Sequence, residues 1–596
     1  MQSQDRIRNF SIIAHIDHGK TTLTDAFLHT TGTVGPLEIR ERIMDSNPIE
    51  QEKGVTIKLA PVRMEYEHRG EKYILNLIDT PGHVDFGYEV SRSLAACEGA
   101  LLLIDATQGV QAQTLANFEK AKALGLKIIP VINKIDMVNA DIDQVTLEIM
   151  DILGVTESEI LKTSAKNGQG VDEVLQAIVE KVPAPSGDAS GPLRAMIITS
   201  IFDSHQGAIA YVRVFDGELV NQPLYLLSTH TPINPVEIGV FKPERKKRDK
   251  LAVGEVGYVS TGLKDITPLK VGDTITTVKA KSQVEKLPGY KEPTPMVFME
   301  LYPVDAQDFT ALKDAMGKLT LHDSALQYKP THSAALGNGL RVGFLGIFHA
   351  EIVRERLSRE FNLNLIATAP SVSYRLMNKQ HQTTIVNTPA EFPDPSQIET
   401  LEEPITKATI FTPEEYIPAI YKLTREKRGE LTNTFHTGNR VRLEYTLPLA
   451  ELITHFHDSL KSVSSGFASL EYEVVGYQPI DAIKVDILIN KEPIEALSFI
   501  AVSNTAEEKG RSLVSKLKEV LPRQMFEVPI QAVIGGKVIA RETLKAFRKD
   551  VTAKLYGGDV TRRMKLLRKQ SKGKKKMKSI GKVELNQETF LAVLKN

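Results

Sequence analysis

The chain has 596 residues, enough for roughly four domains of about 150 residues each. Hydrophobic residues make up 42% of the chain and charged residues 25%, as in ordinary soluble globular proteins, and no apolar run reaches the roughly 18 residues of a membrane span. The polar residues 1–9 lack the apolar core of a secretory signal, and the single Cys97 excludes a disulfide framework or a zinc site. We therefore expect a cytosolic protein with several domains.

The charge is unevenly distributed along the chain although the net charge is zero. Residues 541–582 contain 16 Lys or Arg and 3 Asp or Glu, which leaves 58 basic and 71 acidic residues elsewhere. Such a basic segment predicts a polyanionic partner, and the acidic remainder argues against nucleic-acid binding over the whole surface. Few aromatic residues accompany the positive charge, so contact with phosphates is favoured over reading of bases. A merely disordered basic end is the alternative.

A glycine turn near the start of the chain is typical of a phosphate-binding loop. The stretch "AHIDHGKTT" lies between an apolar run, residues 10–14, and a helix-like stretch, residues 23–29. It matches G-x-x-x-x-G-K-[ST] except that Ala14 replaces the first glycine, which the loop tolerates if the φ angle of Ala14 is negative. By itself, the match leaves a chance surface Gly-Lys-Thr as an equal alternative. The candidate nucleotide-binding residues here are Asp17, His18, Gly19, Lys20, Thr21 and Thr22.

The chemistry of such a loop requires a lysine on the β- and γ-phosphates and a hydroxyl on Mg²⁺, which Lys20 and Thr21 supply. Asp17 adds a carboxylate near the phosphates, and two interpretations stay open: it binds an additional cation, such as a monovalent ion, or a water, or it makes a local turn hydrogen bond. The stretch "EKGVTIKL" carries Thr56 in a segment with few helical signals, as a mobile switch loop needs. Thr56 is therefore expected to close over Mg²⁺ when a γ-phosphate is present.

The stretch "LNLIDTPGHVDF" ends an apolar strand with a carboxylate. Asp79 is suited to hold Mg²⁺ through water, and the backbone N–H of Gly82 can meet the γ-phosphate. His83 follows directly, so we expect its side chain to orient or polarise an attacking water and to be the catalytic group. An exposed loop histidine is the alternative for His83.

The stretch "VINKID" ends another apolar strand with Asn-Lys-x-Asp, the set formed by Asn133, Lys134, Ile135 and Asp136. Asp136 can accept hydrogen bonds from the N1 and N2 donors of guanine, which adenine does not offer together, while Asn133 can donate to N7 and Lys134 can lie over the base. In "KTSAK", the Ala165 N–H can reach the guanine O6, with Ser164 and Lys166 beside it. A solvated loop explains Asn-Lys-x-Asp alone better, but all the motifs in this order predict a guanine-nucleotide switch that binds GTP or GDP with Mg²⁺.

Beyond a Pro/Gly/Ser-rich linker at residues 182–192, the pattern changes to short alternating runs that predict a β-barrel, residues 192–281. Within it, "FKPERKKRDK" is interpreted as a solvated barrel loop, with an RNA contact as the alternative. From residue 296, strand and helix patterns alternate as in a split α/β sandwich, and a second such module follows the loop "TPAEFPDPS". His455 and His457 in "THFHDS" are expected on a helix surface, since no third metal ligand lies near them in the sequence.

The nucleotide motifs "AHIDHGKTT", "DTPGHVDF" and "NKID" resemble those of the translational GTPase family, in which Ala14 and His83 are typical at their positions. The stretches "LPRQMFEVPIQAVIGGKVIARETLKAFRKDVTAKLYGGD" and "FLAVLK" are similar to the elongation factor 4 (LepA) branch of that family. The stretch "LPLAELITHFHDSLKSVSSGFASLEYE" resembles the fifth domain of elongation factor G, but no segment between it and "GFLGIFHAEI" is long enough for that protein's tip-like fourth domain. A forward-translocating factor is therefore disfavoured.

The resemblance implies a multidomain α/β and β fold. Its expected parts are a P-loop GTPase domain (1–185), a translation-type β-barrel (190–282), two ferredoxin-like α/β modules (293–375 and 400–482, the second like the C-terminal part of elongation factor G), and a family-specific basic C-terminal domain (483–596).

The resemblance also implies a ribosome-dependent GTPase of protein synthesis, a monomer that contacts rRNA, ribosomal proteins and bound tRNAs. Its implied action is to remodel ribosomes by back-translocation of tRNAs or by rescue of stalled or mis-translocated complexes. A GTP-regulated ribosome-assembly or initiation factor is the alternative. Family members also associate peripherally with the cytoplasmic face of the cell membrane.

Overall fold

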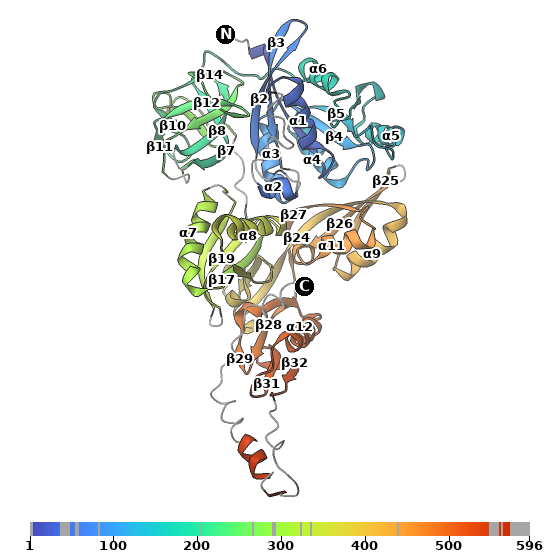
Figure 1. Ribbon diagram of the computed structural model, residues 1–596, viewed down its shortest axis with the longest axis vertical. Helices are drawn as coiled ribbons and strands as arrows, with labels where there is room; N and C mark the ends of the chain where they lie inside the picture. The colour runs from blue at the N-terminus through green and yellow to red at the C-terminus, as the bar shows by residue number, and fades with distance from the viewer. Residues whose placement is uncertain are drawn as a thin grey trace.

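The computed structural model describes most of the chain: residues 4–35, 48–53, 56, 59–81, 84–203, 206–264, 268–288, 294–321, 323, 325–333, 336–437, 440–547, 560–561 and 564–571. Figure 1 shows an elongated molecule in which a helix-covered sheet and a barrel lie side by side at one end. Two further sheets lie below them, and a last sheet with one long helix lies beyond those. No helix in these described ranges is long and apolar enough to cross a membrane.

The first sheet has the strand order β2-β3-β1-β4-β5-β6, and its pairs are parallel except for β2 with β3. Its strands are β1 (Ile7–Ala14), β2 (Ala60–His68), β3 (Glu71–Asp79), β4 (Gly99–Asp105), β5 (Lys127–Asn133) and β6 (Leu161–Lys162). Its helices are η1 (Gln4–Arg6), α1 (Lys20–Thr30), α2 (Pro48–Lys53), η2 (Val84–Phe86), α3 (Gly87–Ala95), α4 (Ala112–Ala123), α5 (Ile142–Leu153), η3 (Glu157–Glu159) and α6 (Val171–Lys181). The carboxyl ends of β1, β3, β4 and β5 therefore meet at one edge, where open α/β sheets bind ligands.

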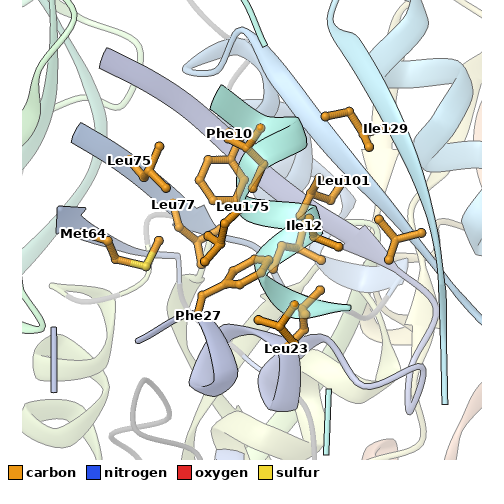
Figure 2. Close-up of a cluster of buried hydrophobic side chains, with 14 of the residues drawn as sticks. Phe10, Ile12, Leu23, Phe27, Met64, Leu75, Leu77, Leu101, Ile129 and Leu175 are labelled. Carbon is orange, nitrogen blue, oxygen red and sulfur yellow. The ribbon is translucent and has the colours of Figure 1, made fainter. Parts of the chain in front are cut away.

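One face of this sheet packs against α1 and α6 through fully buried apolar side chains (Figure 2). Phe10 and Ile12 of β1 meet Leu23 and Phe27 of α1, and the rings of Phe10 and Phe27 lie edge to face with centroids 6.3 Å apart. Burying each such side chain stabilises the fold by about 1.5–3 kcal/mol. This packing fixes β1 against α1, and so fixes both ends of the loop between them.

The barrel is an antiparallel sheet of order β11-β10-β16-β7-β8-β15-β12-β13, with a short β14-β9 pair. Its strands are β7 (Arg194–Asp203), β8 (Gly207–Asp216), β9 (Leu219–Val220), β10 (Leu224–Leu226), β11 (Thr231–Ile233), β12 (Glu237–Lys242), β13 (Glu244–Lys247), β14 (Lys250–Leu251), β15 (Val256–Ser260) and β16 (Thr274–Thr277). The interpretation of residues 241–250 as a loop is wrong, because most of this stretch lies in the end of β12, in β13 and at the start of β14. Its charged residues suit an edge strand, where they oppose pairing with other chains.

The third sheet, of order β18-β19-β17-β20 with β21 on β17, carries two helices. Its elements are β17 (Val297–Pro303), η4 (Ala306–Asp308), α7 (Phe309–Thr320), β18 (Gln327–Ser333), β19 (Gly337–Phe344), α8 (Ile347–Phe361), β20 (Leu365–Ala367) and β21 (Ser371–Val372). In Figure 1, α8 lies on the side that faces the first sheet.

The fourth sheet has the order β23-β22-β24-β26-β25, with β27 paired to β24. Its elements are β22 (Tyr374–Asn378), β23 (Thr383–Val386), η5 (Pro389–Glu391), η6 (Pro395–Gln397), β24 (Ile398–Pro413), η7 (Glu414–Tyr416), α9 (Ile417–Glu426), β25 (Glu430–Thr437), β26 (Arg440–Pro448), α10 (Leu449–Leu452), α11 (Phe456–Val463) and β27 (Ser469–Pro479). Residues 376–399, which the predicted boundaries leave between two domains, contribute part of β22 and all of β23 to this sheet.

The last sheet has the order β29-β28-β31-β32, with β30 on β28. Its elements are β28 (Ala482–Ile489), β29 (Glu492–Pro493), η8 (Glu495–Leu497), β30 (Phe499–Val502), α12 (Ala506–Val520), β31 (Val528–Ile534) and β32 (Lys537–Leu544). Much of the basic segment 562–578 lies outside the described residues, and of it only 564–571 is seen, as a helix.

Polar contacts with little access to solvent join the first sheet to the barrel. Arg63 pairs with Glu255, and Arg213 pairs with Glu98; the two arginine side chains are 5% and 3% exposed. Asn9 donates a hydrogen bond of 3.0 Å to the carbonyl of Gly254. A small apolar cluster beside these contacts includes side chains from both units: Leu59, Ile78, Ala96, Cys97, Ile198 and Val256.

Candidate functional site

The phosphate loop connects β1 to α1 at the carboxyl edge of the first sheet. Ala14 lies in the extended strand β1, opposite Leu103 of β4, so its position does not need a glycine. Gly19 has a φ of 93°, and a Cβ at this position would lie 2.4 Å from the side-chain nitrogen of Asn133. Thr21 and Thr22 lie in the first turn of α1, whose backbone N–H groups and dipole favour an anion.

Three predicted residues from separate segments meet beside this loop. The Lys20 Nζ lies 2.9 Å from Asp79 Oδ1 and 3.2 Å from Thr56 Oγ1, and it also donates to the carbonyl of Thr80. Thr56 Oγ1 lies 3.4 Å from Asp79 Oδ2. Lys20, Thr56 and Asp79 are all buried, with exposures of 9%, 4% and 1%. The structure thus brings the lysine, the hydroxyl and the carboxylate to one point.

The oxygen atoms of this cluster fit a hard cation. Mg²⁺ prefers oxygen ligands and usually takes one or two from the protein, together with phosphate oxygens and water. In the described part of the chain, no group of three or more His, Cys, Asp or Glu side chains could hold a metal ion, so a site made of such protein ligands alone is not seen there. Thr56 and Asp79 therefore offer oxygen atoms of the kind that Mg²⁺ takes from a protein beside a phosphate, and the hydroxyl of Thr21, at the start of α1, is predicted to join them.

The segment that is predicted to read the base is tied to the phosphate loop by hydrogen bonds. Asn133, at the end of β5, donates from Nδ2 to the carbonyl of His18 over 2.9 Å, and its Oδ1 accepts from the N–H of Ala165 over 3.0 Å. Lys134 has a φ of 62° and donates from Nζ to the carbonyl of Asp17 over 2.6 Å. The two halves of the predicted nucleotide site are therefore adjacent and share a backbone framework.

The other predicted base-side residues differ in their exposure. Asp136 and Lys166 are exposed, whereas Ile135 packs partly buried against an apolar cluster and Ser164 is fully buried. Asp136 therefore has the accessibility that a base-reading carboxylate needs, and Ile135 and Ser164 anchor the two loops.

Asp105 is a polar residue of the site that the sequence analysis missed. It ends β4, is fully buried, and lies 2.8 Å from Lys134 Nζ through its Oδ2. Burial raises its pKa, but hydrogen bonds from Lys134 and Thr107 outweigh burial and hold the pKa below its usual range. The signal was available, because Asp105 ends the apolar run "GALLLID" just as Asp79 ends "LNLID".

The histidines of the loop are neutral groups. Burial lowers the pKa of His18 to about 3 and that of His15 to about 4. His18 Nδ1 accepts a hydrogen bond of 3.3 Å from the backbone N–H of Asp105, so its ring links the loop to the end of β4. The positive charge near the loop therefore comes from Lys20 and Lys134.

Gly82 and His83 lie outside the described residues, so their positions stay predictions. The chain on either side of them is seen: Pro81 follows the end of β3, and η2 (Val84–Phe86) leads into α3. A cavity of about 1620 Å³ opens beside the phosphate loop, with His15, Ile16, Asp17 and Asp85 in its lining together with residues of the third, fourth and last sheets. His455 and His457 also line this cavity, and both are exposed on or beside α11.

Comparison with known proteins agrees with this architecture. Residues 5–184 match the family model of the elongation factor Tu GTP binding domain, residues 400–488 the elongation factor G C-terminus, and residues 489–595 the GTP-binding protein LepA C-terminus. A crystal structure of a protein from Thermus thermophilus shares the fold, with a TM-score of 0.56 at 18% identity over 80% of this chain and 97% of that one. The fold and the site define a GTP-binding protein of the elongation-factor class.

Full-length relatives narrow this class. Elongation factor 4 of Bacillus cereus is 50% identical over 595 residues, which cover 99% of this chain and 98% of the relative. Elongation factor 4 of Desulfitobacterium hafniense is 50% identical over 597 residues, with 100% and 99% covered. The chain therefore belongs to the elongation factor 4 family of translational GTPases, the ribosome-dependent enzymes of protein synthesis that bind GTP and hydrolyse it to GDP and phosphate.

Proposed function

We propose that this protein binds ribosomes that carry tRNAs and uses GTP hydrolysis to remodel them, by back-translocation or by rescue of stalled or mis-translocated complexes. The observation that supports the proposal best is the meeting of Lys20, Thr56 and Asp79 at one buried point. Thr56 and Asp79 come from the two segments that a γ-phosphate is expected to order. A change from GTP to GDP can therefore change the position of these segments, which contact the other sheets.

The proposed roles follow from the chemistry of each group. Lys20 and the loop from Asp17 to Thr22 bind the phosphates, with a monovalent cation proposed beside Asp17. Thr21, Thr56 and Asp79, the last through water, hold Mg²⁺, which when bound supplies charge neutralisation on the phosphates. Gly82 meets the γ-phosphate, and His83 orients the attacking water. The guanine pocket is formed by Asn133, Lys134, Ile135, Asp136, Ser164, Ala165 and Lys166.

The basic segment 562–578 is the proposed contact with ribosomal RNA, because concentrated Lys and Arg side chains bind phosphates without reading sequence. The same charge suits the anionic surface of a membrane, so a peripheral association with the cytoplasmic face is part of the proposal.

Multiple-turnover GTPase assays with intact ribosomes, separated subunits and no ribosomes test this function. We expect strong stimulation by intact ribosomes carrying tRNAs, together with a GTP-dependent shift of the tRNAs toward the pre-translocation position. Stimulation by a separated subunit, with no shift of tRNAs on intact ribosomes, would instead indicate an assembly or initiation factor.

A further inference from the structure

Asp85 connects the segment that follows β3 to the third sheet. It lies in η2, two residues after His83, and its Oδ2 accepts a hydrogen bond of 3.1 Å from the backbone N–H of His349. His349 is the third residue of α8, and the residue before α8 is Gly346, which has no side chain to cap the helix. Asp85 thus caps α8 from a different unit, as an N-cap side chain does within one helix.

The surroundings of Asp85 reinforce this contact. The ring of Phe86, the next residue, lies edge to face with Phe348 of α8, with centroids 6.4 Å apart. A Cβ on Gly346 would lie 2.2 Å from the carboxyl carbon of Asp85. Position 346 therefore suits a glycine, because the carboxylate of Asp85 occupies the space beside it.

The same carboxylate reaches the fourth sheet. The hydroxyl of Tyr472, on β27, lies 3.4 Å from Asp85 Oδ1. Three residues earlier on β27, Ser469 Oγ accepts a hydrogen bond of 3.0 Å from the backbone N–H of Ala112, the first residue of α4. The strand β27 therefore contacts both Asp85 and a helix of the first sheet.

The far end of α8 meets the other nucleotide-side segment. Arg359, in the last turn of α8, lies 2.5 Å from a carboxylate oxygen of Glu52, which belongs to α2 and precedes the predicted switch residue Thr56 in the chain. The helix α8 of the third sheet therefore contacts both the segment before Thr56 and the segment after Asp79.

We propose that Asp85 is a positioning residue that couples the nucleotide state of the first sheet to the third and fourth sheets, by capping α8 and holding Tyr472 in one nucleotide state and releasing them in the other. This inference rests on the proposed function, since it assumes that GTP hydrolysis changes the position of η2 relative to α8. Asp85 acts by fixing where η2 lies relative to α8, through the backbone N–H of His349 and the hydroxyl of Tyr472.

The glycine at 346 provides a control that separates coupling from helix capping. Asp85→Ala removes the cap and leaves α8 without one, so a loss of activity in this variant alone does not distinguish the two roles. The double variant Asp85→Ala/Gly346→Asp returns an N-cap carboxylate to α8 from the residue just before the helix, and the truncation at 85 removes the three atoms that lie nearest to the new Cβ. Asp85→Asn, which keeps an acceptor oxygen, is the conservative variant.

The first measurement needs no ribosome. Hydrogen exchange at the first turn of α8, residues 346–350, is compared with GDP and with a non-hydrolysable GTP analogue. The wild type is expected to show different exchange in the two states, whereas the double variant shows equal protection in both. Equal exchange in the two states of the wild type, or a nucleotide-dependent difference that persists in the double variant, would overturn the proposal.

The second measurement is ribosome-stimulated turnover. We expect Asp85→Ala and the double variant to lose about tenfold or more in stimulated kcat, a typical coupling effect. The double variant should nevertheless regain the melting temperature of the wild type. Asp85→Asn should retain most of the turnover. Full recovery of turnover in the double variant would make Asp85 a helix cap only. Absence of ribosome stimulation in the wild type would instead contradict the proposed function, and the exchange experiment would still decide the role of Asp85.

Discussion

At the scale of single residues, Gly19 is constrained from two sides. Its φ of 93° is costly for any residue with a side chain, and the amide of Asn133 occupies the space where a Cβ would lie. Asn133 in turn binds the carbonyl of His18. The glycine of the phosphate loop is thus required by Asn133, at the end of β5, as well as by the phosphates that the loop is expected to bind.

His83 is predicted to act on the attacking water. His83→Ala should therefore leave GTP affinity nearly unchanged and lower ribosome-stimulated kcat by roughly 10²- to 10⁴-fold, the usual contribution of a positioned acid or base. Multiple-turnover GTPase assays on ribosomes measure this loss. His381→Ala is the matched control, since the His381 side chain is 75% exposed in the turn between β22 and β23 of the fourth sheet. Near-normal stimulated turnover in His83→Ala would contradict the catalytic assignment.

Asp136 is predicted to select guanine. Asp136→Asn should shift the preference from guanine toward xanthine nucleotides by roughly 10- to 100-fold, because the amide can donate to the xanthine O2 where the carboxylate accepts from the guanine N1 and N2 donors. Turnover with GTP and with xanthosine triphosphate measures the shift. If the preference for GTP is unchanged, Asp136 does not read the base.

The sequence predicted the residues whose chemistry is encoded at short spacing. Lys20, Thr56, Asp79 and Asn133 each stand at a recognisable position in a motif, and the structure brings the first three within hydrogen-bonding distance of one another. The role of Asp85 could not be predicted in this way. Its partners lie 264 and 387 residues further along the chain, and no local pattern encodes how separate sheets pack together.

At the scale of elements, apolar patterns predicted the strands and helices of the first sheet correctly, whereas the structure of a charge-rich stretch was predicted wrongly. The expected strand and helix around the phosphate loop, residues 10–14 and 23–29, lie inside β1 and α1. The interpretation of residues 241–250 as a solvated loop is wrong, because Lys242 pairs with Glu244 and Gly239 with Lys247 across the β12–β13 hairpin. An edge strand keeps its charged side chains in solvent, so composition alone does not separate it from a loop.

Glu471 lies on β27, the strand that contacts α4. The ionisation of its carboxyl makes the stability of the folded state depend on pH. Burial raises the pKa of its carboxyl to about 7, and Lys120, which lowers the pKa, only partly offsets burial and the negative charges of Asp85 and Glu473. The folded state therefore holds a proton that the unfolded chain, with an ordinary carboxyl pKa, loses at lower pH. Stability from this group is present at acidic pH and declines as the pH rises from the ordinary carboxyl pKa through about 7.

Glu471→Gln should remove this dependence. The variant is expected to be more stable than the wild type at pH 8, by on the order of 1–3 kcal/mol, and the difference should shrink at pH 5.5. Thermal unfolding at the two pH values measures it. Glu430→Gln, an exposed position on β25 of the same sheet, is the matched control. A pH profile in Glu471→Gln equal to that of the wild type would show that the Glu471 carboxyl does not titrate in this range.

At the scale of the whole molecule, the basic segment is predicted to bind ribosomal RNA through its phosphates. Changing Lys574, Lys575, Lys576 and Lys578 to Ala should weaken ribosome binding and flatten its salt dependence, since each phosphate contact contributes roughly 0.7–0.9 to the slope of log affinity against log salt. GTP affinity of the free protein should not change. The fourfold Lys→Arg variant keeps the charge and should bind as the wild type does. Unaltered affinity and slope in the Ala variant would leave the segment without this role.

The buried contacts between the first sheet and the barrel make these two units one mechanical body. Separating them would expose the apolar cluster around Cys97 and return the charges of Arg63 and Arg213 to water without their carboxylate partners. The connection between them, by contrast, is exposed at residues 186–190. A protease that nicks this connection should therefore leave two fragments that still migrate together through a sizing column and part only when denatured.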